Sequence, residues 1–178
     1  KYTILLGKIA MRSSLLMWTW DGGGVVDVGA NIGDTVINMG IKDVKYLLIE
    51  GEKQYAQFID ANLKEYNYSL EQCFLADYVL EDSYESVAVN GTGHLQRINS
   101  DKVNNVAFMT LDELLETKYK DFVIDLLKID TDGFDFRVLR GAVRALKRQK
   151  PVLYFEWSSQ LLKEQGEDCV SIFCWLHS

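Results

Sequence analysis

Short apolar runs alternate along the chain with segments in which apolar residues recur every three or four positions. A continuous apolar run bounded by glycine or charged residues is typical of a strand that is buried on both faces of a parallel sheet. Such runs occupy residues 22–30 (GGGVVDVGA), 45–51 (KYLLIEG), 72–77 (QCFLAD), 121–130 (DFVIDLLKID) and 152–157 (VLYFEW). We predict a buried strand in each of them.

Segments with helical spacing lie between or after these runs. Thr110 and Glu113 form a capping-box pattern at the start of one such segment. Pro151 is the single proline of the chain and ends another. Helices are predicted over residues 31–40, 52–67, 110–116, 134–149 and 168–178.

Residues 86–98 differ from the rest, because polar and apolar positions alternate on both sides of Asn90-Gly91. This dipeptide is typical of a tight β-hairpin turn. Elsewhere strands and helices alternate, which favours a parallel sheet with helices on both faces. The predicted fold class is therefore α/β, a Rossmann-like, doubly wound and mostly parallel sheet, with one antiparallel hairpin inserted.

The composition is that of an ordinary globular domain. Of 178 residues, 48% are hydrophobic and 25% are charged, and the formal net charge is −7. Because an acidic protein repels phosphate backbones, we expect no nucleic-acid partner. A row of cations is interpreted as a solvated helix face; it comprises Arg137, Arg140, Arg144, Lys147, Arg148 and Lys150. No apolar run has the length of a membrane span.

The number and spacing of the cysteines indicate whether the protein works in a reducing or an oxidising compartment. Cys73, Cys169 and Cys174 form no CxxC pair, which argues against a disulfide framework and against a zinc site. All three have apolar neighbours, so we expect buried thiols in a reducing environment and a cytoplasmic location.

The chain divides into a short N-terminal segment and one domain. Residues 1–20 are apolar with a few cations, but Arg12 interrupts the apolar part and no clear cleavage site follows. We therefore expect an N-terminal helical segment or cap over residues 1–20, rather than a signal peptide. Residues 21–178 form the predicted domain.

Two glycines follow the first predicted strand in the pattern D-x-G-x-x-x-G. Gly29 permits a tight turn close to a ligand, and Gly33 lets a helix begin near the strand. Glu50 ends the second predicted strand, where a carboxylate can accept hydrogen bonds from both hydroxyls of a ribose. Because ligands bind beyond the carboxyl ends of parallel strands, the expected cofactor-binding residues are Asp27, Gly29, Ala30, Asn31, Gly33, Asp34, Thr35, Glu50, Gly51, Asp77 and Asp130.

Two nucleoside cofactors fit this plan, S-adenosylmethionine and NAD. The dinucleotide fingerprint GxGxxG needs glycine at two positions where the chain has Asn31 and Asp34. The Asp34 carboxylate would repel a pyrophosphate, whereas S-adenosylmethionine carries no phosphate and has an ammonium and a sulfonium. Asp27 is a candidate to hold its amino-acid end, directly or through water. The charges therefore favour the methyl donor.

Charged residues gather where the fourth and fifth predicted strands end. If the ligand is S-adenosylmethionine, methyl transfer needs alignment of the reactants and removal of the acceptor's proton. A carboxylate whose pKa is raised by burial can act as the base, and Lys128 can bind or polarise the acceptor oxygen. The catalytic candidates are Lys128, Asp130, Asp132 and Glu156. Alternatively, Asp130, Asp132 and Glu156 hold Mg²⁺, which acidifies the acceptor group.

Structural roles stay open for several of these charges. Asp132 can cap the helix that follows it, and Lys128 can form an ion pair with Asp130. Asp135 is expected to be an acidic residue of the first helical turn rather than a catalyst. Outside this cluster, His94 and Trp157 are candidates for contacts with an acceptor.

The motifs VVDVGANIGDTV, LLIEG, TLDELL, LLKIDTDGFDFRVLRGA and PVLYFEW follow one another in this order. Together, over residues 24–177, they resemble the FkbM family of methyltransferases. The resemblance implies a class I methyltransferase fold that uses S-adenosylmethionine, generally to methylate hydroxyl oxygens of sugars, glycolipids or secondary metabolites. The family more often has glutamate at the positions of Asp132 and Asp135. It often has histidine soon after the acid that matches Glu156, where this chain has Trp157.

Three functions stay open at this stage. The first is an S-adenosylmethionine-dependent O-methyltransferase whose partner is a small-molecule hydroxyl acceptor. The second is an NAD-dependent oxidoreductase. The third is a non-catalytic, methyltransferase-like binding domain, because this fold usually closes with two further strands and we expect the sheet to lack them. The sequence predicts no oligomeric state.

Overall fold

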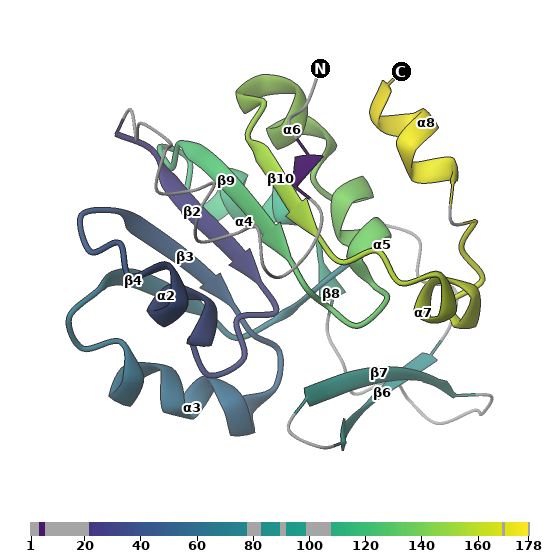
Figure 1. The fold of residues 1–178 in the computed structure, drawn as a ribbon, viewed down its shortest axis with the longest axis horizontal. Coiled ribbons are helices and arrows are strands. Elements are labelled where there is room, and N and C mark those ends of the chain that lie inside the picture. The colour runs from purple at the N-terminus through teal and green to yellow at the C-terminus, as the bar shows by residue number, and fades with distance from the viewer. Residues whose placement is uncertain are drawn as a thin grey trace.

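The computed structural model describes residues 4–5, 22–77, 83–89, 92–98, 108–168 and 170–177 (Figure 1). Its strands are β1 (Ile4–Leu5), β2 (Gly24–Val28), β3 (Lys45–Ile49), β4 (Asn67–Glu71), β5 (Phe74–Leu75), β6 (Ser83–Val89), β7 (Thr92–Ile98), β8 (Phe108–Met109), β9 (Ile124–Ile129) and β10 (Val152–Phe155). Its helices are α2 (Asp34–Met39), α3 (Lys53–Asn62), α4 (Leu111–Lys118), α5 (Asp135–Arg140), α6 (Val143–Gln149), α7 (Ser159–Glu164) and α8 (Ser171–His177).

The main sheet has six parallel strands in the order β1-β10-β9-β2-β3-β4. The chain runs outward from β2 through β3 to β4, then returns to β9 beside β2 and continues outward to β10. The topological switch point therefore lies between β2 and β9, where ligands bind in open α/β sheets. The predicted Rossmann-like fold class is confirmed. Strand β1 pairs with β10 and forms the outer edge of the sheet on that side.

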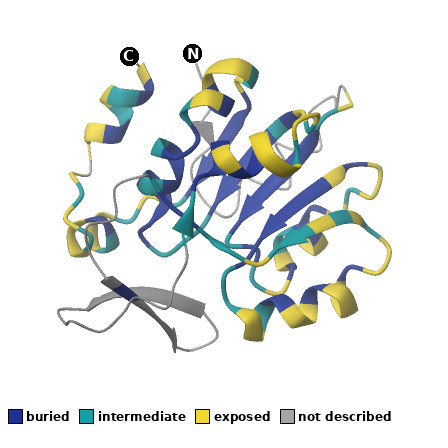
Figure 2. Cartoon of the chain, turned by 180° about the vertical axis from the view of Figure 1, so that it is seen from behind, coloured by how far each residue is buried: buried dark blue, intermediate teal, exposed yellow. Residues whose placement is uncertain are grey.

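Helices cover both faces of the sheet, and apolar side chains fill the space beneath them. On one face, Val25 and Leu48 pack with α2 and α3 through Val36 and Ile59. On the other face, alternate strand residues pack with α4, α5, α6, α7 and α8. Figure 2 shows the central strands as the most deeply buried part of the molecule. A sheet covered on both faces explains the continuous apolar runs of the sequence.

The third strand of the main sheet differs from the prediction. It is β4, residues 67–71, and not residues 72–77. The preceding helix α3 correspondingly ends at Asn62 rather than continuing to residue 67. Because β4 is an edge strand, it alternates polar and apolar residues and is only partly buried. Within the predicted run, Phe74–Leu75 forms β5, which pairs in parallel with β8 outside the main sheet.

The predicted helix over residues 134–149 is divided into α5 and α6 at Gly141. A Cβ atom on Gly141 would lie 2.3 Å from the carbonyl oxygen of Ala76, so the helical chain touches the backbone of the β5 region at this residue. Periodicity alone does not reveal such an approach. Helix α7, which was not predicted, begins where the Ser158 hydroxyl accepts a hydrogen bond from the Leu161 amide at 3.4 Å.

Other predictions have mixed outcomes. The hairpin is confirmed as β6 and β7, which pair antiparallel from Ser83–Ile98 to Val89–Thr92, and its turn lies outside the described residues.

In the expected N-terminal helical segment, Ile4–Leu5 form strand β1, and the remaining residues 1–3 and 6–20 lie outside the described residues. No helix in the described ranges has the length and apolar character needed to cross a membrane.

The expectation of three buried thiols was wrong for Cys174, which is exposed, and Cys73 is half-buried. Cys174 lies in α8, an end helix with one face turned outward, and its apolar neighbours Ile172 and Leu176 occupy the inner face. Apolar neighbours in sequence therefore do not place a residue on the buried side of a helix. Cys169 lies outside the described residues.

Asp112 links α4 to the start of α6 and gives a test of the fold. Its buried carboxylate accepts hydrogen bonds from the Arg144 and Ala145 amides, both at 2.8 Å. In Asp112→Asn, an amide NH₂ faces one of these donors, so we expect the free energy of unfolding to fall by about 1–3 kcal/mol in urea titrations. Asp60→Asn changes an exposed carboxylate and should stay within about 0.5 kcal/mol of the unmodified protein. Equal losses in the two variants would contradict this interpretation.

Candidate cofactor pocket and active site

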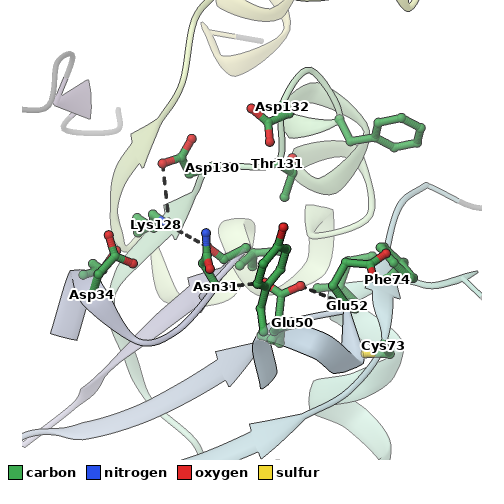
Figure 3. A pocket seen from close by; sticks show the side chains of 18 residues that line it. Asn31, Asp34, Glu50, Glu52, Cys73, Phe74, Lys128, Asp130, Thr131 and Asp132 are labelled. Carbon is green, nitrogen blue, oxygen red and sulfur yellow. Dashed lines mark hydrogen bonds and ion pairs between the residues drawn. The ribbon is translucent and has the colours of Figure 1, made fainter. Parts of the chain in front are cut away.

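A cavity of about 210 Å³ lies at the carboxyl ends of β2, β3 and β9, next to the switch point (Figure 3). It brings together residues from loops far apart in the sequence. The predicted site residues that line it are Gly29, Asn31, Asp34, Thr35, Glu50, Gly51, Lys128, Asp130 and Asp132. The fold therefore gathers most of the residues that the sequence singled out.

Glu50 is bound directly to the glycine loop. Its Oε2 accepts a hydrogen bond from the Asn31 amide at 2.8 Å, and its Oε1 accepts one from the Glu52 amide at 2.7 Å. Burial raises the pKa of the Glu50 carboxyl, and the two amide donors act in the opposite direction. The side chain is thus fixed in one orientation at the wall of the cavity.

Gly29 is required by both its conformation and its surroundings. Its φ is +77°, and a Cβ atom there would lie 2.0 Å from the carbonyl oxygen of Asp130. The loops after β2 and β9 are therefore in direct backbone contact. Gly33 has a different role, because its Cβ position would lie 2.9 Å from Leu63, and it packs against the end of α3 rather than lining the cavity. Ala30 is likewise fully buried away from the cavity.

A buried ion pair underlies the cavity. Lys128 Nζ lies 2.8 Å from Asp27 Oδ1 and 3.9 Å from Asp130 Oδ2, and it donates a hydrogen bond to the Gly29 carbonyl at 3.0 Å. Burial opposes the charged lysine, but the two carboxylates outweigh it and raise the pKa of Lys128. Burial also raises the pKa of Asp27, and the nearby ammonium opposes that rise. At 2.8 Å, attraction favours both groups in their charged forms.

This geometry changes the expected role of two residues. Asp27 is completely buried and does not line the cavity, so Lys128 stands between it and any ligand there. The ammonium of Lys128 is already engaged by Asp27 and by Gly29. Lys128 is therefore placed to shape the floor of the cavity and to fix the glycine loop.

Two other predicted residues lie outside the cavity. Asp77 forms ion pairs with Arg137 at 3.3 Å and with Arg140 at 2.8 Å. Its expected place among the cofactor ligands is not supported, because those arginines direct it toward α5. Glu156 also does not line the cavity, and its amide donates to Asp135 Oδ1 at 3.1 Å. The side chain of His94 lies outside the described residues.

The row of cations on α5 and α6 is only partly the solvated face that we expected. Arg137 and Arg140 turn to Asp77, and Arg140 also reaches Glu167 at 2.5 Å. Arg144 pairs with Glu116 at 2.6 Å. The exposed members of the row are Arg144, Lys147, Arg148 and Lys150.

Asp132 is not the N-cap residue of α5, in contrast to the structural role considered for it. Helix α5 starts after Phe134 without a side-chain cap, and Asp132 itself has a φ of +50° in the turn before it. Its side chain is half-buried and lines the cavity. Asp135 is buried in the first turn of α5, where burial raises the pKa of its carboxyl to about 6.

An aromatic wall was missed by the sequence reasoning. Phe74 and Phe134 line the cavity, and Phe108 packs between them with centroid distances of 6.0 and 6.2 Å. Tyr84 of the hairpin strand β6 lies edge-on to Phe134 at 5.1 Å and is buried. These rings come from four separate segments, so their meeting leaves no local pattern in the sequence.

Comparison with known families gives one finding. A family model described as the methyltransferase FkbM domain matches residues 27–178. That match covers most of the chain, including every residue that lines the cavity.

The chain belongs to the FkbM methyltransferase domain family. Searches of curated proteins and of solved structures found no match. Membership supports methyltransferase activity in general, and the cavity described above is the candidate site for it.

The charges around the cavity of this FkbM domain are mostly negative. Among the described residues that line it, Lys128 is the cation, and the carboxylates are Asp34, Glu50, Glu52, Asp130 and Asp132. The magnesium alternative gains no support, since no three His, Cys, Asp or Glu side chains in the described ranges are arranged to hold a metal ion. The site therefore favours a ligand with positive charge.

Replacement of Lys128 tests the buried ion pair of the FkbM domain. In Lys128→Met, Asp27 stays buried without its ammonium, and the free energy of unfolding should fall by about 3–5 kcal/mol near neutral pH. Burial holds the folded-state pKa of Asp27 above its unfolded value, so protonation on acidification favours the folded variant. The deficit relative to the unmodified protein should therefore shrink as the pH falls toward about 4.

Urea titrations of both proteins at several pH values give this difference. Lys42→Met, which removes the exposed ion pair with Glu65, serves as the control and should cost at most about 1 kcal/mol. A Lys128→Met deficit that does not change with pH would show that Asp27 is not the group left uncompensated.

Proposed function

We propose that this FkbM domain is an S-adenosylmethionine-dependent O-methyltransferase acting on a hydroxyl group of a sugar, a glycolipid or a secondary metabolite. The observation that carries the proposal is the joint position of the Gly29–Asn31 loop and Glu50 at one cavity. Gly29 allows the loops after β2 and β9 to meet at this cavity, because a Cβ there would collide with the Asp130 carbonyl. When bound, S-adenosylmethionine supplies an electrophilic methyl group on a sulfonium.

Glu50 is suited to hold the ribose of the donor. Its carboxylate is fixed by two backbone amides, and each oxygen keeps a further lone pair that can accept from a hydroxyl. The apolar side chains of Ile49, Phe74 and Leu75 line the same cavity and offer surface for an adenine ring. Hydrogen-bond acceptors beside apolar surface fit a nucleoside.

Charge supports S-adenosylmethionine over NAD. Among the described residues, the carboxylates that line the cavity outnumber the Lys128 ammonium, which is itself paired with Asp27. A pyrophosphate would meet repulsion there, whereas the sulfonium and ammonium of the methyl donor would be attracted. This argument agrees with the absence of the second and third fingerprint glycines.

Asp130 and Asp132 are the leading candidates for the proton acceptor. Both line the cavity, and the side chain of Asp130 is about one-third exposed (32%). A carboxylate within reach of the acceptor hydroxyl can receive its proton as the methyl group is transferred. The Lys128 ammonium lies 3.9 Å from the Asp130 carboxylate and helps to position it. Glu156 is a weaker candidate, because it lies outside the cavity.

Titration with S-adenosylhomocysteine tests the donor assignment. We expect saturable heat in calorimetry, with stabilisation of about 2.7 kcal/mol when the ligand is at about 100 times its dissociation constant. NADH should give neither effect. Binding of NADH without S-adenosylhomocysteine would favour the oxidoreductase alternative. Donor binding without transfer of labelled methyl to any hydroxyl pool would favour a non-catalytic domain.

Glu50→Gln tests the ribose contact. A glutamine presents an NH₂ group to one of the two amide donors, so the side chain turns and one acceptor is lost. We expect the affinity for S-adenosylhomocysteine to fall at least tenfold in calorimetry. Glu65→Gln makes the same chemical change at an exposed ion pair with Lys42 and should leave the affinity within twofold. Equal affinities in the two variants would show that Glu50 does not contact the bound donor.

A further inference from the structure

We infer that Asp135 is a positioning residue that fixes the Thr131–Phe134 turn in the shape that the cavity requires. The inference rests on the proposed function, because the cavity in question is the proposed donor pocket. Asp135 does not line that cavity and acts through the residues that do.

Asp135 joins the ends of two neighbouring strands. Its Oδ2 accepts hydrogen bonds from the Thr131 amide at 3.3 Å and from the Thr131 hydroxyl at 3.0 Å. Its Oδ1 accepts a hydrogen bond from the Glu156 amide at 3.1 Å. Thr131 follows β9 and Glu156 follows β10, so one carboxylate fixes both loops. At 1% exposure it is shielded from competing water.

These bonds explain why an acid stands at this position of α5. An acidic residue in the first turn of a helix usually serves the free amides or the dipole of that helix. Here all three bonds run to residues outside α5. The expectation that Asp135 is an ordinary first-turn acid was therefore incomplete, because its partners lie on two strand ends.

The turn that Asp135 holds has an unfavourable backbone. Asp132 has a φ of +50° and Gly133 has a φ of +102°, so two successive residues adopt left-handed conformations. A non-glycine residue keeps such a conformation only when its surroundings impose it. Hydrogen bonds to Thr131 on one side and the start of α5 on the other supply that constraint.

The shape of the turn matters for ligand binding. Thr131, Asp132 and Phe134 all line the cavity. A Cβ on Gly29 would lie 3.5 Å from the Thr131 methyl group, so the turn also contacts the glycine loop. Release of Thr131 would therefore disturb both sides of the proposed pocket.

Asp135→Asn tests the inference in the full chain. The asparagine NH₂ group faces one of the amide donors, so at least one of these hydrogen bonds is lost; the Thr131 bonds matter most, because the Glu156 amide also donates to the Ile129 carbonyl at 3.2 Å. We expect the dissociation constant for S-adenosylhomocysteine to rise at least tenfold in calorimetry, with stoichiometry correcting for any unfolded fraction. Unchanged affinity would overturn the inference.

Asp112→Asn is the matched control. Asp112 is also a buried carboxylate that accepts from backbone amides on another segment, but it lies outside the cavity. Both variants should lose stability, whereas only Asp135→Asn should lose affinity. If Asp112→Asn lowers the affinity equally, Asp135 acts through general stability, and the inference is wrong.

A second measurement does not depend on the ligand. In amide NMR spectra of the free protein, Asp135→Asn should shift the signals of Thr131, Gly133 and Gly29, and Asp112→Asn should leave them in place. Unmoved signals would overturn the inference. If the unmodified protein shows no binding of S-adenosylhomocysteine, the proposed function fails, and the spectra still decide the role of Asp135.

If Asp135→Asn does not fold, Thr131→Val carries the test. Valine keeps the shape of threonine and removes the hydroxyl that donates to Asp135 at 3.0 Å. We expect the Gly133 and Glu156 amide signals to shift and the dissociation constant to rise about threefold, as for loss of one hydrogen bond. Spectra and affinity like those of the unmodified protein would overturn the inference.

Discussion

The ion pair between Lys128 and Asp27 is the interaction on which the candidate site depends. It joins β9 to β2 at the switch point of the sheet, and both side chains are almost completely buried. The same ammonium binds the Gly29 carbonyl, so it fixes the loop that begins the cavity. Two buried charges are stable here because each offsets the desolvation of the other. A hydrophobic pair of similar volume would fill the space but would leave the Gly29 carbonyl without its donor.

This arrangement separates charges that hold the fold from charges that face a ligand. Asp27 is withdrawn behind Lys128, whereas Asp130 and Glu50 border the cavity. The Glu50 carboxylate can be buried because hydrogen bonds from two backbone amides, at 2.7 and 2.8 Å, replace those that it would form with water. The lining of the cavity is consequently mostly negative, and each oxygen of the buried Glu50 carboxylate has a hydrogen-bond donor. Such a field selects ligands by charge before any specific contact is made.

The sequence was sufficient to predict what depends on parallel strand order. Loops after β2, β3 and β9 meet at one edge whenever those strands are neighbours, so Gly29, Glu50 and Asp130 were expected together. Contacts set by tertiary packing could not be predicted. Strand β4 was missed because an edge strand carries no continuous apolar run. Asp77 was predicted to bind the cofactor, because the residues next to it in sequence give no sign of its ion pairs with Arg137 and Arg140. Those arginines lie in α5, more than fifty positions away.

The two ends of the Thr131–Phe134 turn, which both line the cavity, are held by different kinds of interaction. Directional hydrogen bonds fix the Thr131 side of the turn, whereas ring packing against Tyr84 and Phe108 supports Phe134 at its other end. Ring packing tolerates small displacements better than hydrogen bonds do. Phe134 can therefore shift by a small amount more easily than Thr131, so the two ends of the turn differ in rigidity.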